Sequence, residues 1–205
     1  MKKISILIVA MCTMVLAGCG VNDVLNTVNG TNGTNTANSL GNVLTSVLGL
    51  DKVTAESLVG TWRYSGPGVA FTSENLLAKA GGEMAASAAE SKLLEVYKKM
   101  GVKSSNTYFT FSKDGKYQGQ FMGVPMNGSY TYNASSGALT MQGTLIKFNT
   151  YIQGKSNGIA MLFEGTKLLT LFQTVAGASG NSTLGTISSL TSNYKGLRIG
   201  FQLSH

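Results

Sequence analysis

From Leu58 to the C-terminus, apolar and polar residues alternate in short runs with a period of two. This alternation is typical of β-strands that bury one face. It predicts eight strands, at residues 58–65, 106–112, 116–122, 125–133, 138–143, 145–153, 157–163 and 196–204. Glycine-containing turns such as Lys113-Asp114-Gly115 and Ser135-Ser136-Gly137 separate neighbouring strands, and Gly123 and Pro125 separate the third strand from the fourth. Antiparallel hairpins follow from these short connections.

Three segments keep a helical period instead. Residues 73–100 begin at Ser73, a plausible N-cap, and end before Gly101, which suits the left-handed C-terminal position. Residues 167–176 and 182–193 are amphipathic, and the glycines between them predict a helical hairpin.

The order of elements therefore predicts a mainly β domain over residues 51–205. A first strand is followed by a long helix, six strands, a helical hairpin and a closing strand. Eight antiparallel strands commonly close into a barrel, because closure removes exposed edges. An open sheet with helices on one face is the structural alternative.

The N-terminus has a different pattern. Lys2-Lys3 precede an apolar run at residues 4–16, and Leu16-Ala17-Gly18-Cys19 follows. This order predicts a signal peptide at residues 1–18. The box resembles that of bacterial lipoproteins, and the resemblance implies that Cys19 is lipidated and anchors the protein in the cell envelope.

Residues 19–50 are expected to form a tether. Residues 20–38 are rich in Asn, Thr and Gly, whereas residues 39–50 carry an amphipathic pattern that predicts a short helix. This helix is expected to dock on the domain or to lie on the membrane surface, and docking is favoured because the segment has no lysine. Gly20 follows Cys19, so the Asp retention signal of some lipoproteins is missing and the outer membrane is favoured.

Composition argues against several functions. The net charge of +7 falls to +5 when Lys2 and Lys3 leave with the signal, and the excess is diffuse, so no nucleic-acid partner is expected. Cys12 lies in the signal and Cys19 takes the lipid, so no thiol remains for a disulfide, a metal or catalysis. The only histidine, His205, is the last residue, where fraying is the default. We expect no enzyme activity, no cofactor and no metal.

Two resemblances make the fold prediction more specific. Gly60-Thr61-Trp62 in the first strand resembles the Gly-x-Trp signature of lipocalins, which implies that Arg198 in the last strand packs on Trp62 and closes the barrel. More broadly, residues 56–205 resemble a family of lipocalin-like lipoproteins of unknown function from anaerobic gut bacteria. The resemblance rests on Val59 to Pro67, the Ala-rich helix ending in Lys98-Lys99-Met100-Gly101, Phe109-Thr110-Phe111 before Asp114-Gly115, and Asn193 to Phe201. It implies a lipocalin-like barrel and carries no catalytic residue.

Aromatic residues at alternate strand positions are the candidates for lining the barrel. The candidate ligand-lining residues are Tyr64, Phe109, Phe111, Tyr117, Phe121, Tyr130, Tyr132, Phe148, Met161 and Phe163. They either fill the interior or leave a cavity there. The first hypothesis is a membrane-anchored module that binds a small apolar or amphipathic ligand. The second is a solid-core structural or interaction protein that docks on an envelope partner, and an enzyme of carbohydrate or lipid chemistry is the third.

Overall fold

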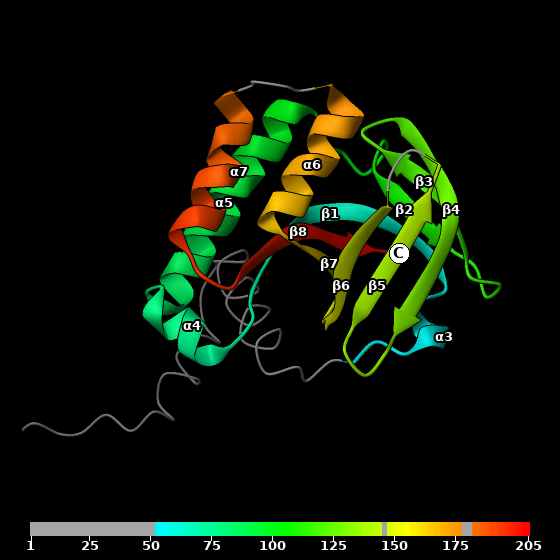
Figure 1. Ribbon diagram of the computed structural model, residues 1–205, viewed down its shortest axis with the longest axis horizontal. Helices are drawn as coiled ribbons and strands as arrows, with labels where there is room; N and C mark the ends of the chain where they lie inside the picture. Colours follow the sequence, from blue (N-terminus) through cyan, green and yellow to red (C-terminus); the bar gives the residue numbers. More distant parts are fainter. Residues whose placement is uncertain (1–51, 145–146, 178–181) are drawn as a thin grey trace, which may run out of the picture. The chain divides into compact units, whose positions relative to one another are not determined.

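Eight antiparallel strands follow one another around a closed ring (Figure 1). The strands are β1 (Gly60–Phe71), β2 (Tyr108–Phe111), β3 (Lys116–Phe121), β4 (Val124–Asn133), β5 (Ala138–Gly143), β6 (Lys147–Lys155), β7 (Gly158–Glu164) and β8 (Leu197–Ser204). Each strand pairs with the next, and β8 pairs with β1. The predicted mainly β fold of eight antiparallel strands is confirmed, and the open-sheet alternative is wrong because β1 has strand partners on both sides.

The computed structural model describes residues 52–144, 147–177 and 182–205. All of these residues belong to one compact unit. The predicted signal peptide at 1–18, the lipidation site Cys19 and the segment 19–50 lie outside the described residues.

Strand β1 is longer than its prediction at 58–65. A β-bulge between Tyr64 and Gly66 shifts the register against β8, and the strand then continues through Pro67 to Phe71. Beyond Arg63 the strand pairs with β8 and no longer with β2. Pro67 is tolerated there, because this part of β1 has a strand partner on one side only.

Five helices accompany the strands in the described residues: α3 (Ala55–Leu58), α4 (Glu74–Lys79), α5 (Gly82–Met100), α6 (Gly165–Ala176) and α7 (Ser182–Asn193). The single helix expected at 73–100 is wrong, because Gly81 and Gly82 adopt φ of +104° and +69° and divide it into α4 and α5. Both predicted ends are confirmed. The hydroxyl of Ser73 accepts a hydrogen bond from the amide of Leu76 at 3.3 Å, and Gly101 caps α5 with φ of +77°.

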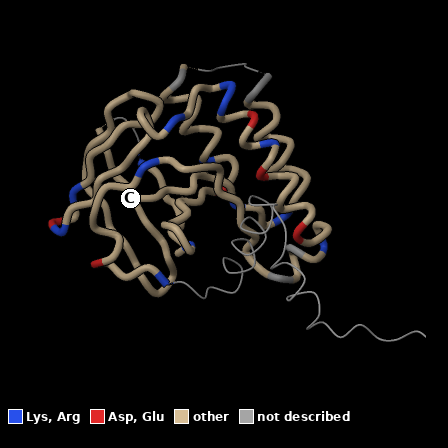
Figure 2. The backbone as a smooth tube through the Cα atoms, turned by 180° about the vertical axis from the view of Figure 1, so that it is seen from behind, with Lys and Arg blue, Asp and Glu red and all other residues tan. Residues whose placement is uncertain are grey.

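Helices α4, α5, α6 and α7 gather on one side of the ring, whereas α3 lies apart from them (Figure 1). Helix α5 packs along β1 and against α7, and α6 contacts β7 and β8. None of the helices in the described ranges is both long and apolar enough to cross a bilayer. The charged residues are spread over turns and helices in the view from behind (Figure 2), as the diffuse charge of the sequence suggests.

Candidate functional site

The ten candidate ligand-lining residues lie together inside the barrel. Phe109, Phe111, Tyr117, Phe121, Phe148, Met161 and Phe163 are buried members of the main core, and Tyr64, Tyr130 and Tyr132 are partly buried against it. Alternation brings them to one face because successive side chains of a strand point to opposite sides of the sheet. Their role toward a ligand stays a prediction.

Two aromatic residues from helices complete this interior. Phe172 of α6 lies 5.2 Å from Phe121 and 6.3 Å from Phe201 between ring centroids. Tyr97 of α5 lies 5.6 Å from Phe172 and 5.4 Å from Phe201. Sequence reasoning did not place Tyr97 or Phe172 here, although Leu168, Leu171 and Phe172 form the apolar stripe of a helix. Periodicity identifies such a stripe but not what it packs on.

The rings meet across the interior. Phe163 lies 5.7 Å from Phe148 and 5.9 Å from Phe201, and Phe121 lies 5.4 Å from Phe201. Aromatic pairs at such distances contribute about 0.5–1.5 kcal/mol beyond the area that they bury. In this conformation, side chains from four strands and α6 therefore occupy the space that a ligand would take.

Trp62 closes the end of the barrel where β1 begins. Its indole Nε1 donates a 2.8 Å hydrogen bond to the carbonyl of Leu58 in α3, and its ring lies 3.8 Å from the ring of His205. Nδ1 of His205 also lies 3.1 Å from the carbonyl oxygen of Thr61. The terminal histidine is therefore packed on Trp62, and the expectation that it frays is wrong.

Arg198 does not pack on Trp62, contrary to prediction. Its guanidinium carbon lies 3.3 Å from the centre of the Tyr151 ring. Because β8 runs antiparallel to β1, the start of β1 meets the end of β8, and Arg198 is paired with Ala70 near the other end of β1. Arg198 also points outward, since Leu197 and Ile199 on either side of it are buried in the main core. The contact with Tyr151 is a cation–π interaction worth about 0.5–2 kcal/mol.

Three tyrosine hydroxyls donate hydrogen bonds to backbone carbonyls of the barrel and its flanking segment. Tyr97 donates to the carbonyl of Gly200 at 2.9 Å, Tyr130 to that of Ser112 at 2.8 Å, and Tyr132 to that of Val53 at 2.8 Å. The hydroxyl of Tyr117, in contrast, is buried without a hydrogen-bond partner.

Burial disfavours the phenolate form of these side chains. It raises the pKa of Tyr64 to about 12 and that of Tyr97 well above its usual value. Burial likewise raises the pKa of Tyr117 and Tyr132, and for Tyr130 the charge of Asp114 adds to the effect. These phenols therefore stay protonated and neutral near pH 7.

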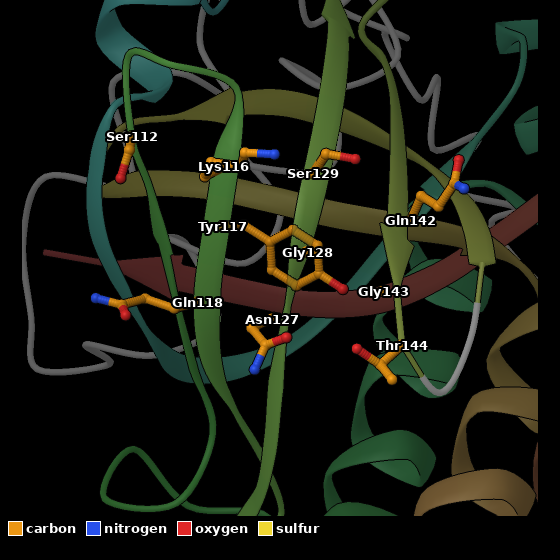
Figure 3. Close-up of a pocket in the computed structure, with 10 residues that line it drawn as sticks. All are labelled: Ser112, Lys116, Tyr117, Gln118, Asn127, Gly128, Ser129, Gln142, Gly143 and Thr144. Carbon is orange, nitrogen blue, oxygen red and sulfur yellow. The ribbon is translucent and has the colours of Figure 1, made fainter.

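An open polar hollow of about 650 Å³ lies over β3, β4 and β5. Its lining consists of Ser112, Lys116, Tyr117, Gln118, Asn127, Gly128, Ser129, Gln142, Gly143 and Thr144. Gly128 is paired with Tyr117 on one side and Gly143 on the other, and the Tyr117 ring lies across Gly128 with its hydroxyl directed toward Gly143 (Figure 3). Sequence reasoning missed this hollow, because polar residues on an outward face are ordinary.

The hollow can hydrogen-bond a polar ligand through amides and hydroxyls. Its lining has neither a histidine nor a carboxylate, the usual groups for proton transfer. No group of three or more His, Cys, Asp or Glu side chains suited to a metal ion occurs within residues 52–144, 147–177 and 182–205.

Comparison with known proteins agrees with this architecture. The family described as Lipocalin-like domain (DUF4923) matches residues 32–205, so the chain belongs to this family and the resemblance of its sequence is confirmed. No curated protein matches the chain significantly. Among solved structures, a DUF4847 family protein from Bacteroides vulgatus is similar at 17% identity and a TM-score of 0.32, covering 54% of this chain and 88% of that one.

Proposed function

We propose that this lipocalin-like protein is a lipid-anchored, non-catalytic binding protein of the bacterial envelope. Its ligand is a small apolar or amphipathic molecule that enters the interior of the barrel. The observation that carries the proposal is the aromatic interior, which side chains of α6 cover at the mouth near the helices.

Helix α6 is the element whose movement would open this interior. Neighbouring strands are held by continuous ladders of backbone hydrogen bonds, whereas α6 contacts the barrel through Leu168, Leu171 and Phe172, all fully buried. Side-chain packing alone makes a smaller cooperative unit than a hydrogen-bonded sheet, so α6 separates at a lower free energy. A bound apolar molecule would replace the contacts of the Phe172 ring with Phe121 and Phe201.

The proposed anchor rests on the sequence before the domain. The order of charged, apolar and small residues before Cys19 supports export and lipidation, and Gly20 supports the outer membrane. Several acyl chains, at about 0.8 kcal/mol per buried methylene, would make the attachment effectively permanent. Replacing Cys19 with Ala should release the protein from the membrane fraction, and an unchanged distribution would contradict the anchor.

A non-catalytic role is supported by the chemistry of the chain. The only histidine, His205, is stacked on Trp62. Glu90 of α5 accepts a hydrogen bond from the side-chain amide of Gln202 at 3.1 Å, so this carboxylate has a structural contact.

A second candidate is a solid-core protein that docks on an envelope partner. It is favoured by the contacts among Phe121, Phe163, Phe172 and Phe201, which fill the interior. In that case the outer surface performs the recognition, and no molecule enters the barrel.

One experiment separates the two candidates. Native mass spectrometry of protein purified from its own cells should show a bound small molecule, and an environment-sensitive fatty dye should bind. Phe172→Ala should increase dye affinity at least tenfold, because it vacates space in the interior. Leu190→Ala in α7 is the matched control, since Leu190 is also buried in the core but is not among the rings that meet in the interior. Absence of ligand and of dye binding in both the natural protein and Phe172→Ala would favour the second candidate.

A further inference from the structure

Two hydroxyl groups of the barrel wall are buried without a hydrogen-bond partner. They are the phenol oxygen of Tyr117 on β3 and Oγ1 of Thr150 on β6, and the two side chains are 3% and 1% exposed. The buried hydroxyl of Tyr97, in contrast, donates to the carbonyl of Gly200. Buried polar atoms are normally paired, so each unpaired one calls for an explanation.

Both side chains point into the barrel rather than into the solvent. Tyr117 pairs with Phe111 of β2, and both belong to the main core. Thr150 lies between Phe148 and Ile152 at alternate positions of β6, and those two are core residues as well. Alternate residues of a strand share one face of the sheet, so the two hydroxyls face the interior to which the ligand is assigned.

The hydroxyl of Tyr117 lies over backbone rather than over other side chains. Its ring extends across Gly128 of β4, and the hydroxyl is directed toward Gly143 of β5 (Figure 3). These two glycines pair with each other in neighbouring strands. Neither position has a side chain that could hydrogen-bond the hydroxyl or cover it.

The interior of the barrel offers no charge to a ligand. Within residues 52–144, 147–177 and 182–205, the buried polar or charged residues are Thr107 and Thr150, so no buried Asp, Glu, Lys, Arg or His side chain occurs there. Lys116 and Gln118, on either side of Tyr117, are exposed. An ionised group that leaves water without an opposite charge costs far more free energy than a hydroxyl that gains a hydrogen bond. The interior therefore favours an uncharged ligand.

The Tyr117 hydroxyl is suited to a neutral partner. A phenol both donates and accepts a hydrogen bond, so it matches a hydroxyl or a carbonyl of a ligand. Burial raises the pKa of Tyr117, so the hydroxyl keeps its proton near pH 7. The phenols of Tyr130 and Tyr132 differ, because they already donate to the carbonyls of Ser112 and Val53.

We infer that the ligand of the barrel is an uncharged amphipathic molecule whose hydroxyl or carbonyl group binds the Tyr117 hydroxyl. This inference rests on the proposed function, in which a small molecule replaces the contacts of Phe172 at the mouth beside α6. Phe121 contacts Phe172 there, and Gly119 separates Phe121 from Tyr117 on the same face of β3. Four residues of a strand span about 13 Å. The apolar part of the ligand therefore lies along β3 from Phe121, and its polar end reaches Tyr117.

A cycle of two ligands and two proteins tests this contact. The ligands are dodecanol and chlorododecane, which share an alkyl chain but differ in their ability to hydrogen-bond. The proteins are the chain from residue 19 with Cys19→Ser and the same chain with Tyr117→Phe. Displacement of a neutral naphthylamine dye at pH 7 gives each affinity. The preference for the alcohol should fall about tenfold in Tyr117→Phe, because the hydroxyl of the ligand is then buried without a partner.

Two controls separate this contact from general effects. Tyr151→Phe removes a phenol hydroxyl from the outer face of β6, where Tyr151 packs against Ala70, Ala160 and Leu162, and it should leave the preference unchanged within twofold. Dodecanoate has the same chain length and a charged end. Its affinity should change less than twofold in Tyr117→Phe, because its carboxylate stays in water at the mouth.

The possible results distinguish this inference from the proposed function. An unchanged preference for dodecanol in Tyr117→Phe, with both ligands still displacing the dye, would overturn the inference and leave the proposed function intact. A loss of dodecanoate affinity as large as that of dodecanol would show that a charged group reaches Tyr117, and it would also overturn the inference. If neither the dye nor any ligand binds the natural chain or Phe172→Ala, the proposed function fails and the inference fails with it.

Discussion

The two halves of the barrel wall share one aromatic interior but differ on their outer faces. In the half formed by β2, β3, β4 and β5, the outer face carries amides, hydroxyls and Lys116 around an open hollow. In the half formed by β6, β7, β8 and β1, the outer face carries a buried apolar cluster of Ala70, Ala160 and Leu162 beside Gly68 and Gly200, and we call this face the lane. A closed barrel removes strand edges, yet it does not decide which outer faces meet water.

This difference shows that the burial of an outer strand face depends on which elements pack against it, and not on the sheet itself. Strand β1 has 12 residues and β2 has 4, so β1 extends past β2 and continues beside β8 alone. The extended half contacts α5 and α6, whereas the short half has a polar outer face.

The largest effect should come from placing a carboxylate on each outer face. Leu162→Asp buries a charge without a partner and should lower the free energy of unfolding by about 3–5 kcal/mol. Gln118→Asp, on the exposed hollow, should change it by less than about 0.5 kcal/mol. Urea denaturation of the soluble chain beginning at residue 19, with Cys19→Ser, measures both. If both variants unfold at nearly the same urea concentration as the parent, the lane is a solvated face and the comparison fails.

The next effect concerns the bare backbone of the lane. Gly200→Ala would drive a Cβ atom into the carbonyl of Met161 on β7, and it should cost roughly 2–4 kcal/mol through displaced backbone. Gly66→Ala, in β1, finds no atom within 4 Å and should stay within about 0.5 kcal/mol of the parent. Thermal unfolding of the two variants under one set of conditions gives the comparison, and similar losses would mean that the close approach at Gly200 is relieved in solution.

A smaller effect separates two buried tyrosines. Tyr97→Phe removes the hydrogen bond to the backbone carbonyl of Gly200 on β8 and should cost about 1–2 kcal/mol. Tyr117→Phe, beneath the polar hollow, removes a hydroxyl that has no partner, so stability should be unchanged or rise by up to about 1 kcal/mol. A loss for Tyr117→Phe as large as that for Tyr97→Phe would show that the Tyr117 hydroxyl is hydrogen-bonded in solution.

Much of the fold was predictable because its signals are local. Strand β5 has its predicted bounds at 138–143, and α7 has its predicted bounds at 182–193. The failures are equally local: Gly81 and Gly82 divide the predicted long helix, and the bulge after Tyr64 lengthens β1. Single residues in special backbone conformations break an element while the apolar period continues on both sides of them. The period therefore does not reveal them.

The placement of the candidate site residues was predictable only where the two-residue period of a strand decides on which face a side chain lies. Alternation brought the ten lining candidates into a common core, but it could not place Phe172, whose helix packs on a surface far away in sequence. The expected pairing of Arg198 with Trp62 failed because antiparallel register depends on strand lengths and on the bulge. The sequence pattern did not indicate the lane, because alanine and glycine at alternate positions have little hydrophobic signal.

The smallest effect is a pH dependence that involves the β1 side of the barrel. Burial raises the pKa of Tyr64 to about 12, above its ordinary value of 10.0, so the folded state holds this proton more tightly than the unfolded chain. Stability from this group is therefore complete below pH 10 and is lost as pH rises from 10 toward 12. Tyr64→Phe should flatten the fall of the urea midpoint between pH 10 and pH 12, with no change in slope below pH 9. Tyr132, on β4 in the other half, is another tyrosine whose pKa is raised by burial. If Tyr132→Phe flattens the fall of the urea midpoint as much as Tyr64→Phe does, burial affects the tyrosines of both halves equally.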